Sequence, residues 1–264
     1  MPDSRRRRFL HASGVALLSA LAGCGGTLFE DEMPPSTAEP TPGTETPPGT
    51  DAPTRSPTST DGGANLRVVH AVPNAPNIDI VVFGDAALKD ETFRQISQYL
   101  YLGAERTDIS LVATGNPDRV FFEDAIDFEV GSYTGVVLGE LGENTDRPVE
   151  FRLFDEDLSL PERGSARLQF VNAAPDSNAL RVVRDDGEET LFDGVGYART
   201  ATATLPAGTH RLAVQRADGG DTVTTTEVTL DDRGVYTAFG TGYLAPGDAP
   251  TNAPFEVTLA EDGD

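Results

Sequence analysis

The feature that most constrains the fold is an internal repeat, which emerges when the chain is laid over itself at an offset of 102 to 106 residues. Residues 66–74 (LRVVHAVPN) correspond to 168–176 (LQFVNAAPD), and 131–134 (GSYT) to 234–237 (GVYT). Roughly 100 residues per copy is the size of a small domain rather than of a solenoid unit. We therefore expect two tandem domains, at 64–161 and 162–264.

Each copy consists of short β-rich runs separated by turn signals, and helical periodicity is absent. Aliphatic and polar residues alternate at Ile109-Ser110-Leu111, which is typical of a strand with one buried face. About seven strands in some 100 residues favour an all-β fold, with each copy an immunoglobulin-like antiparallel β-sandwich. In the first copy the strands are expected at 66–71, 78–83, 93–102, 108–113, 120–128, 133–138 and 149–154.

Three segments of the first copy resemble one known family: residues 66–79 (LRVVHAVPNAPNID), residues 99–104 (YLYLGA) and the strand that begins at Tyr133. The family is domain-of-unknown-function family 4397, exported bacterial and archaeal β-domains often found in tandem. The resemblance covers both copies, and the first is the closer because it keeps Pro76 and Asp79. The family brings no established activity, cofactor or catalytic residue, so the resemblance implies fold and location only.

The first 23 residues read as an export signal, with a cationic start and a short apolar stretch that is far below the ~20 residues needed to span a bilayer. Residues 6–10 (RRRFL) resemble the twin-arginine export motif, which a receptor reads. The residues that carry this resemblance are Arg6, Arg7, Phe9 and Leu10.

Cys24, the only cysteine, ends the sequence Leu-Ala-Gly-Cys, which resembles a lipobox. The resemblance implies that its thiol carries a lipid and that the chain is cut before it. The alternative is an unmodified thiol behind an ordinary signal, but an exposed free thiol is an oxidation liability. We therefore predict a protein lipid-anchored to the outer face of the cell membrane. The folded part holds no other cysteine for a disulfide.

Residues 24–63 differ in composition from the rest of the chain, because Pro and Thr dominate from residue 34 onward and aliphatic side chains are almost absent. Such a segment cannot bury enough apolar surface to offset its ordering entropy. We expect a disordered, semi-rigid stalk between the lipid and the first repeat.

The formal charge of −23 excludes nucleic acid as a partner, because binding would add repulsion instead of releasing counterions. Residues 1–23 contribute +3, so the chain from Cys24 onward carries −26. Lys89 is the only lysine. An acidic, nearly lysine-free chain resembles the proteins of salt-loving archaea, in which molar salt screens self-repulsion. An acidic secreted protein from a GC-rich genome is the alternative.

Candidate catalytic and metal-binding groups are few. His70 and His210 stand at non-equivalent places in the two copies, and Asn172 replaces His70 in the second. We interpret His70 and Asn172 as strand-end residues whose side chains hydrogen-bond the following turn. The acidic runs at 123–127 and 155–157 lack a Ca²⁺-loop pattern and are expected to form solvated faces, with weak cation binding as the alternative. No catalytic, cofactor-binding or metal-binding residue is predicted, and no cofactor.

The tyrosines give the only candidate binding surface. Tyr99 and Tyr101 alternate with leucines in the first copy alone, so we predict that they form an exposed recognition surface there, with core packing as the alternative. Tyr133 and Tyr236 follow glycine at equivalent places and are expected to be corner tyrosines that bond backbone. The sequence thus predicts a non-catalytic, membrane-anchored surface structural or protein-interaction module, with a sugar- or peptide-binding receptor as the alternative. The partner would be an unknown surface protein or glycan.

Overall fold

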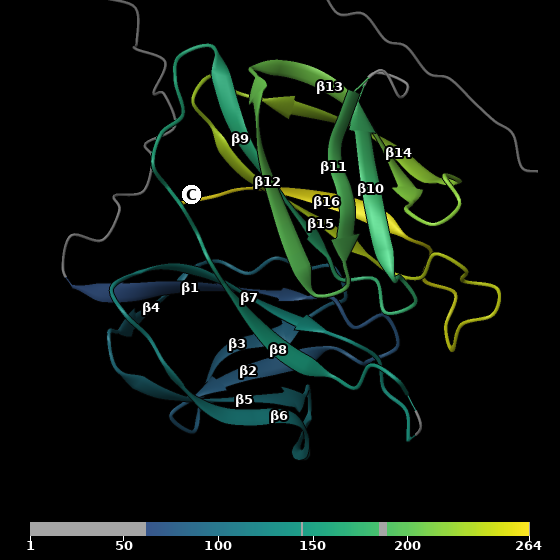
Figure 1. Cartoon of the computed structure of the whole chain (residues 1–264). Helices are drawn as coiled ribbons and strands as arrows, with labels where there is room; N and C mark the ends of the chain where they lie inside the picture. The colour runs from purple at the N-terminus through teal and green to yellow at the C-terminus, as the bar shows by residue number, and fades with distance from the viewer. Residues whose placement is uncertain (1–61, 144, 185–188, 264) are drawn as a thin grey trace, which may run out of the picture. The chain divides into compact units, whose positions relative to one another are not determined.

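The structure, a computed structural model, describes residues 62–143, 145–184 and 189–263. Every regular element in these ranges is a β-strand, as the sequence predicts. All of these strands belong to one compact unit of the chain. They make four sheets of four strands, arranged as two sandwiches, drawn in blue to teal and in green to yellow in Figure 1. Cys24 and the export-signal residues lie outside the described residues.

The first sandwich pairs a sheet in the order β4-β1-β7-β8 with a sheet in the order β3-β2-β5-β6. Its strands are β1 (Gly63–His70), β2 (Ile78–Val82), β3 (Asp85–Glu91), β4 (Leu100–Gly103), β5 (Arg106–Ala113), β6 (Asn116–Asp127), β7 (Gly131–Leu138) and β8 (Glu150–Asp155).

The second sandwich repeats this order strand for strand, as β12-β9-β15-β16 and β11-β10-β13-β14. Its strands are β9 (Ser165–Asn172), β10 (Ala179–Arg184), β11 (Glu189–Gly196), β12 (Arg199–Pro206), β13 (Gly208–Arg216), β14 (Thr222–Leu230), β15 (Val235–Thr241) and β16 (Glu256–Glu261).

The predicted sandwich architecture is confirmed, but two details differ from the expectation. In each sandwich one central pair, β1 with β7 and β9 with β15, runs parallel instead of antiparallel. The expected strand 93–102 is wrong in its first part: a turn at Thr92–Gln95, with Arg94 at φ 71°, separates β3 from the shorter β4. β3 was missed because it is an exposed edge strand with charged residues and little apolar periodicity.

The parallel strands are buried on both faces, and alternate residues serve two different cores. In β1, Leu66 and Val68 enter the core of the first sandwich, whereas Val69 enters a separate apolar cluster. In β9, Phe170 and Val171 divide in the same way between the second core and that cluster. We call this cluster the shared layer; its buried members are Val69, Ala71, Val136, Leu138, Val171, Ala173, Ala198 and Phe239.

Glycine allows an aromatic ring to lie flat on each of these sheets. A Cβ at Gly135 of β7 would lie 2.1 Å from the Phe151 ring, and one at Gly240 of β15 would lie 2.7 Å from the Phe255 ring. Both rings belong to the sandwich cores. They leave the opposite face of each sheet to the shared layer, where the polar groups described next also lie.

Candidate functional site

The most deeply buried charges of the described residues surround Arg67 of β1, whose side chain is 3% exposed. Its Nε donates to Oγ1 of Thr134 at 2.8 Å and lies 3.0 Å from Oε1 of Glu156. Its Nη1 donates to the carbonyl of Glu261 at 3.0 Å, and its Nη2 forms an ion pair with Asp262. One arginine therefore binds a carboxylate from each sandwich.

Further hydrogen bonds fix both carboxylates. The Tyr99 hydroxyl donates to Oε2 of Glu156 at 2.7 Å and accepts from the Gly263 amide at 3.1 Å. The Thr237 hydroxyl donates to Oδ2 of Asp262 at 2.9 Å. Buried carboxylates are stable only when their lone pairs are satisfied in this way. The group around Arg67 is therefore a joint between the sandwiches, and we call it the arginine joint.

The arginine joint uses equivalent strand positions of the two sandwiches except at its centre. Arg67 lies beside Thr134 in the β1/β7 pair, and Gln169 lies beside Thr237 in the β9/β15 pair. Asp155 and Glu261 pair with the equivalent tyrosines of β7 and β15, so the residues that follow them, Glu156 and Asp262, are equivalent too. Two equivalent acids thus share a single cation, because the second copy has a neutral residue at the Arg67 position.

Burial sets the protonation behaviour of this joint. Desolvation raises the pKa of Glu156 above its usual range, against the opposing effects of Arg67 and of its hydrogen bonds. Burial alone would lower the pKa of Arg67, but the charges of Glu156 and Asp262 outweigh it and raise that pKa. Arg67 therefore stays a cation in the folded protein.

The expectation that residues 155–157 form a solvated face is wrong at its middle residue. Asp155 and Asp157 are exposed, but the side chain of Glu156 is only 1% exposed. The backbone explains the difference, because the Glu156 amide donates to the Ser132 carbonyl at 2.9 Å and continues the β8 pairing. Strand alternation then directs Glu156 inward.

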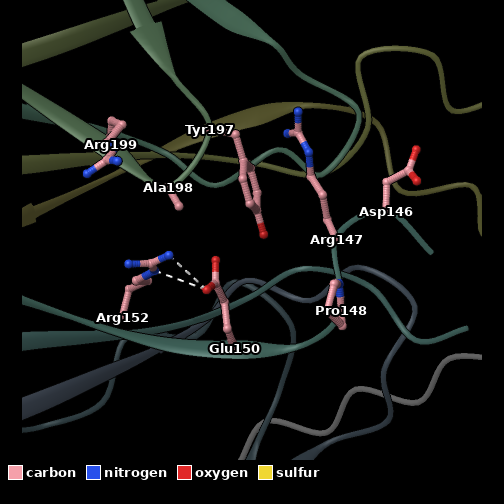
Figure 2. Close-up of a pocket in the computed structure, with 8 residues that line it drawn as sticks. All are labelled: Asp146, Arg147, Pro148, Glu150, Arg152, Tyr197, Ala198 and Arg199. Carbon is pink, nitrogen blue, oxygen red and sulfur yellow. Dashed lines mark hydrogen bonds and ion pairs between the residues drawn. The ribbon is translucent and has the colours of Figure 1, made fainter.

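A pocket of about 330 Å³ lies beside the shared layer, between the loop and strand at β8 and the β11–β12 turn (Figure 2). Residues 146–148, Glu150 and Arg152 come from the first sandwich, and residues 197–199 from the second. Phe151 packs into the sandwich core, so its neighbours Glu150 and Arg152 face the other way. Such a volume is at the lower end of the ~300–1,000 Å³ of small-molecule sites.

Tyr197 forms one wall of this pocket. The guanidinium of Arg147 stacks on its ring, 4.1 Å from the centroid, and is held in place by the Ser177 carbonyl. Among the described residues, the Tyr197 hydroxyl is buried and has no hydrogen-bond partner. Figure 2 shows that hydroxyl pointing toward the Glu150 carboxylate. Burial, together with the charge of Glu150, raises the pKa of Tyr197, so the hydroxyl stays protonated.

Two further arginines face this pocket. Nε and Nη2 of Arg152 each lie 3.0 Å from the same carboxylate oxygen of Glu150. Arg199, the first residue of β12, is exposed. The pocket is lined by three arginines and two carboxylates, Asp146 and Glu150, and so carries a formal charge of +1 in a strongly acidic chain.

The interpretation of His70 as a turn-bonding residue is confirmed. Its Nδ1 accepts from the Val72 amide at 3.3 Å, and its Nε2 lies 3.1 Å from the Pro76 carbonyl. An imidazole that accepts at one nitrogen and donates at the other is neutral. Burial lowers the pKa of His70, which favours the same state.

Asn172 likewise hydrogen-bonds the turn that follows its strand in the second sandwich. Its Oδ1 accepts from the Ala174 amide at 3.2 Å, and its Nδ2 donates to the Ser177 hydroxyl and to the Val195 carbonyl, each at 3.0 Å. His210, by contrast, lies elsewhere in the fold, with Nε2 2.8 Å from the Pro206 carbonyl. The two histidines therefore do not converge on one site.

The corner tyrosines behave as the sequence predicts. The Tyr133 hydroxyl donates to the Glu129 carbonyl at 3.2 Å, and the Tyr236 hydroxyl accepts from the Asp231 amide at 3.1 Å. Each therefore bonds backbone a few residues upstream. Neither is a candidate binding residue.

Tyr99 and Tyr101 lie in different surroundings. Tyr101, in β4, is 58% exposed. Tyr99 precedes β4, is half-buried and belongs to the arginine joint through its hydroxyl. The structure does not bring them together as one exposed face, and the role of either in recognition stays a prediction.

The acidic residues Glu123, Asp124 and Asp127 of β6 are all exposed, in keeping with a solvated face. Within the part of the chain that the structure describes, no three His, Cys, Asp or Glu side chains come together in a way that could hold a metal ion. In the same part, no helix has the length and apolar character needed to cross a membrane.

Sequence reasoning missed the arginine joint and the Tyr197 pocket. The available signal for the joint was the pattern of β1, in which a charged residue interrupts a run that is otherwise apolar on both faces. No sequence signal marks the pocket, because residues 146–152 and 197–199 meet only through the packing of one repeat on the other.

Residues 64–183 match the family described as Domain of unknown function (DUF4397). The match covers the first sandwich and reaches β10 of the second. No curated protein matches this sequence.

Three solved structures illustrate what the chain is similar to in shape. The C-terminal domain of AlgF from P. aeruginosa is 17% identical, with a TM-score of 0.28, over 38% of this chain and 99% of that one. CBMbc, a family CBM26 module from Eubacterium rectale Amy13K solved with maltoheptaose, is 7% identical, with a TM-score of 0.25, over 75% and 99%.

The third is a family 41 carbohydrate-binding module from streptococcal virulence factors, 11% identical with a TM-score of 0.23, over 67% of this chain and 92% of that one. At these TM-scores the likenesses carry no inference about the ligand of this chain.

Proposed function

We propose that the protein is a non-catalytic structural or protein-interaction module on the outer face of the cell membrane. A twin-arginine signal at residues 1–23 exports it, a lipid on Cys24 anchors it, and residues 24–63 form the stalk. Repeats at 64–161 and 162–264 form the displayed body, and the second is a further copy of the same domain of unknown function. The identical strand order of the two sandwiches supports that duplication.

One observation carries this proposal: the most buried charges are used to join the two sandwiches. Arg67, Glu156 and Asp262 are each at most 5% exposed and bind one another. Charges enclosed in this way hold two domains in a fixed relation and cannot reach a substrate. A stalked body with such a joint presents a rigid β-surface to its surroundings.

Protease treatment of intact cells tests display and anchoring together. We expect protease to remove the body from intact cells and the processed protein to sediment with membranes. Cys24→Ser is expected to release the protein into the medium or to leave it uncleaved. Arg6→Lys with Arg7→Lys retains the charge but alters the export motif, and is expected to retain the precursor inside. A body protected until lysis, or a processed Cys24→Ser protein still on membranes, contradicts the proposal.

The second candidate function is a sugar- or peptide-binding receptor, and the Tyr197 pocket favours it. That pocket combines an aromatic wall with arginine side chains and has the volume of a small-molecule site. Titration of sugars and short peptides against the protein, with NMR signals of the pocket residues as the readout, tests it. Absence of any shift at millimolar ligand leaves the structural module as the sole function.

A further inference from the structure

We propose that the Tyr197 pocket binds the carboxylate group of an acidic sugar or of a peptide C-terminus, with Arg199 and Arg152 as the recognition residues. This inference rests on the second candidate function and adds the chemical class of its ligand. The pocket lies across the junction of the two repeats, so the binding site exists only when the sandwiches are packed together.

Arg199 is the arginine of the pocket lining that is best placed to bind a ligand. It is exposed at the start of β12 and lines the pocket. Within the described residues, its guanidinium makes no ion pair or hydrogen bond. A guanidinium presents five donors in a planar fork that matches a carboxylate in two-point geometry. Because no acidic side chain in the described part of the chain occupies it, the Arg199 guanidinium is free to bind a carboxylate in the pocket.

Arg152 supplies the second donor group. Its Nε and Nη2 both contact the same oxygen of Glu150, so its remaining N–H groups are directed elsewhere. In Figure 2 its guanidinium and that of Arg199 lie on the same side of Tyr197, opposite Arg147. Arg147 is not available in the same way, because the ring of Tyr197 and the Ser177 carbonyl already hold it.

The charge of the lining selects the kind of anion. Three arginines and two carboxylates leave +1, which a single negative charge balances. A phosphate dianion would face Asp146 and Glu150 with excess charge, in a protein that already carries −23 overall. A monovalent carboxylate fits this balance, and the Tyr197 ring offers an apolar wall to the remainder of the ligand.

The test uses four probes against the full chain from residue 24 onward. Glucuronate is compared with glucose, and acetyl-Ala-Ala with its C-terminal amide, so each pair differs only in its acidic group. Affinities come from NMR titration at moderate and at molar salt. We expect one or both acids to bind, with weaker affinity at high salt, and the neutral partners to bind at least tenfold more weakly.

Arg199→Gln is expected to weaken acid binding about tenfold or more, because it removes hydrogen bonds between two charged groups. Arg152→Gln should also weaken acid binding. This second variant shows whether the effect depends on the pocket or only on a local change at Arg199. Arg119→Gln, on the exposed face of β6, removes the same charge away from the pocket and should leave affinity unchanged. The unfolding midpoint of each variant checks that the fold is retained.

The outcomes separate the two levels of the proposal. Binding of glucuronate alone assigns an acidic sugar, and binding of the peptide acid alone assigns a peptide C-terminus. If the neutral probes bind in the pocket as tightly as the acids, the carboxylate inference is overturned but the receptor function is supported. Acid binding that survives both arginine variants places the anion elsewhere and overturns the inference. If none of the probes binds, both the carboxylate inference and the receptor function are overturned. The proposal of a structural module on the cell surface is then tested separately by the protease experiment.

Discussion

The two sandwiches share one strand order but differ at the residues through which they meet. The first copy has Arg67 and His70 on β1, where the second has Gln169 and Asn172 on β9. His70 and Asn172 make equivalent turn hydrogen bonds, so that exchange preserves the structure. The exchange of Arg67 for Gln169 does not, because only the arginine binds Glu156 and Asp262.

The comparison shows how two sandwiches of the same strand order become a single body. Without an arginine at either position, Glu156 and Asp262 would be buried without a cation, which is costly. One cation placed between both acids links the copies through charge, while the shared layer links them through apolar contact. The charged part of the junction therefore depends on a position that differs between the sandwiches, and its apolar part on equivalent residues such as Val69 and Val171.

The largest expected effect comes from making the copies alike at this position. Arg67→Gln installs the residue of the second copy and leaves Glu156 and Asp262 buried without a cation. We expect a loss of ~3–5 kcal/mol in the free energy of unfolding, as for other broken buried ion pairs. Chemical denaturation in molar salt measures it, with Arg119→Gln as a surface control expected to change stability by less than ~0.5 kcal/mol. A loss below ~1 kcal/mol would mean that the arginine joint is not a joint.

A smaller effect separates Tyr99 from Tyr101. Tyr99→Phe removes a hydroxyl that donates to Glu156 and accepts from Gly263, so we expect a loss of ~1–3 kcal/mol. Tyr101→Phe alters an exposed ring and should cost less than ~0.5 kcal/mol. Denaturation midpoints of the two variants under identical conditions check this ordering. Equal losses would place both tyrosines in the same environment and contradict the structure.

The smallest effect is a pH dependence at His70. Its folded pKa is lowered, so the unfolded chain, with a His pKa near ~6.5, takes up a proton first as the pH falls. The stability that His70 contributes is thus present above about pH 6.5 and is lost as the pH falls toward the folded pKa. His70→Asn copies Asn172 and should match the wild type within ~1 kcal/mol at pH 8.

Urea unfolding at pH 8 and pH 5 measures that difference. The wild type should lose more stability than His70→Asn between these values, because only the wild type has an ionisable side chain at position 70. An identical loss in the two proteins would show that His70 is not a buried neutral histidine.

The sequence predicted the parts of the fold that depend on local pattern. The sandwich architecture, the corner tyrosines and the roles of His70 and Asn172 all follow from short stretches of the chain. The edge strand β3 was missed because its charged residues carry no apolar alternation.

The candidate sites could not be predicted in this way. Glu156 stands between two exposed aspartates and looks solvated in sequence, and only strand register directs it toward Arg67. Tyr197 and Arg152 lie on different repeats and meet through packing. Sites formed between repeated domains depend on the face by which the domains associate, and a strand that is apolar on both faces does not specify it.

The central claim is that the shared layer and the arginine joint make the two repeats one cooperative body. Calorimetric unfolding of residues 62–264 in molar salt tests it most directly. We predict a single transition whose calorimetric and van't Hoff enthalpies agree, as for a two-state unit. Two separable transitions, one for each repeat, with positions unchanged by Arg67→Gln, would contradict it.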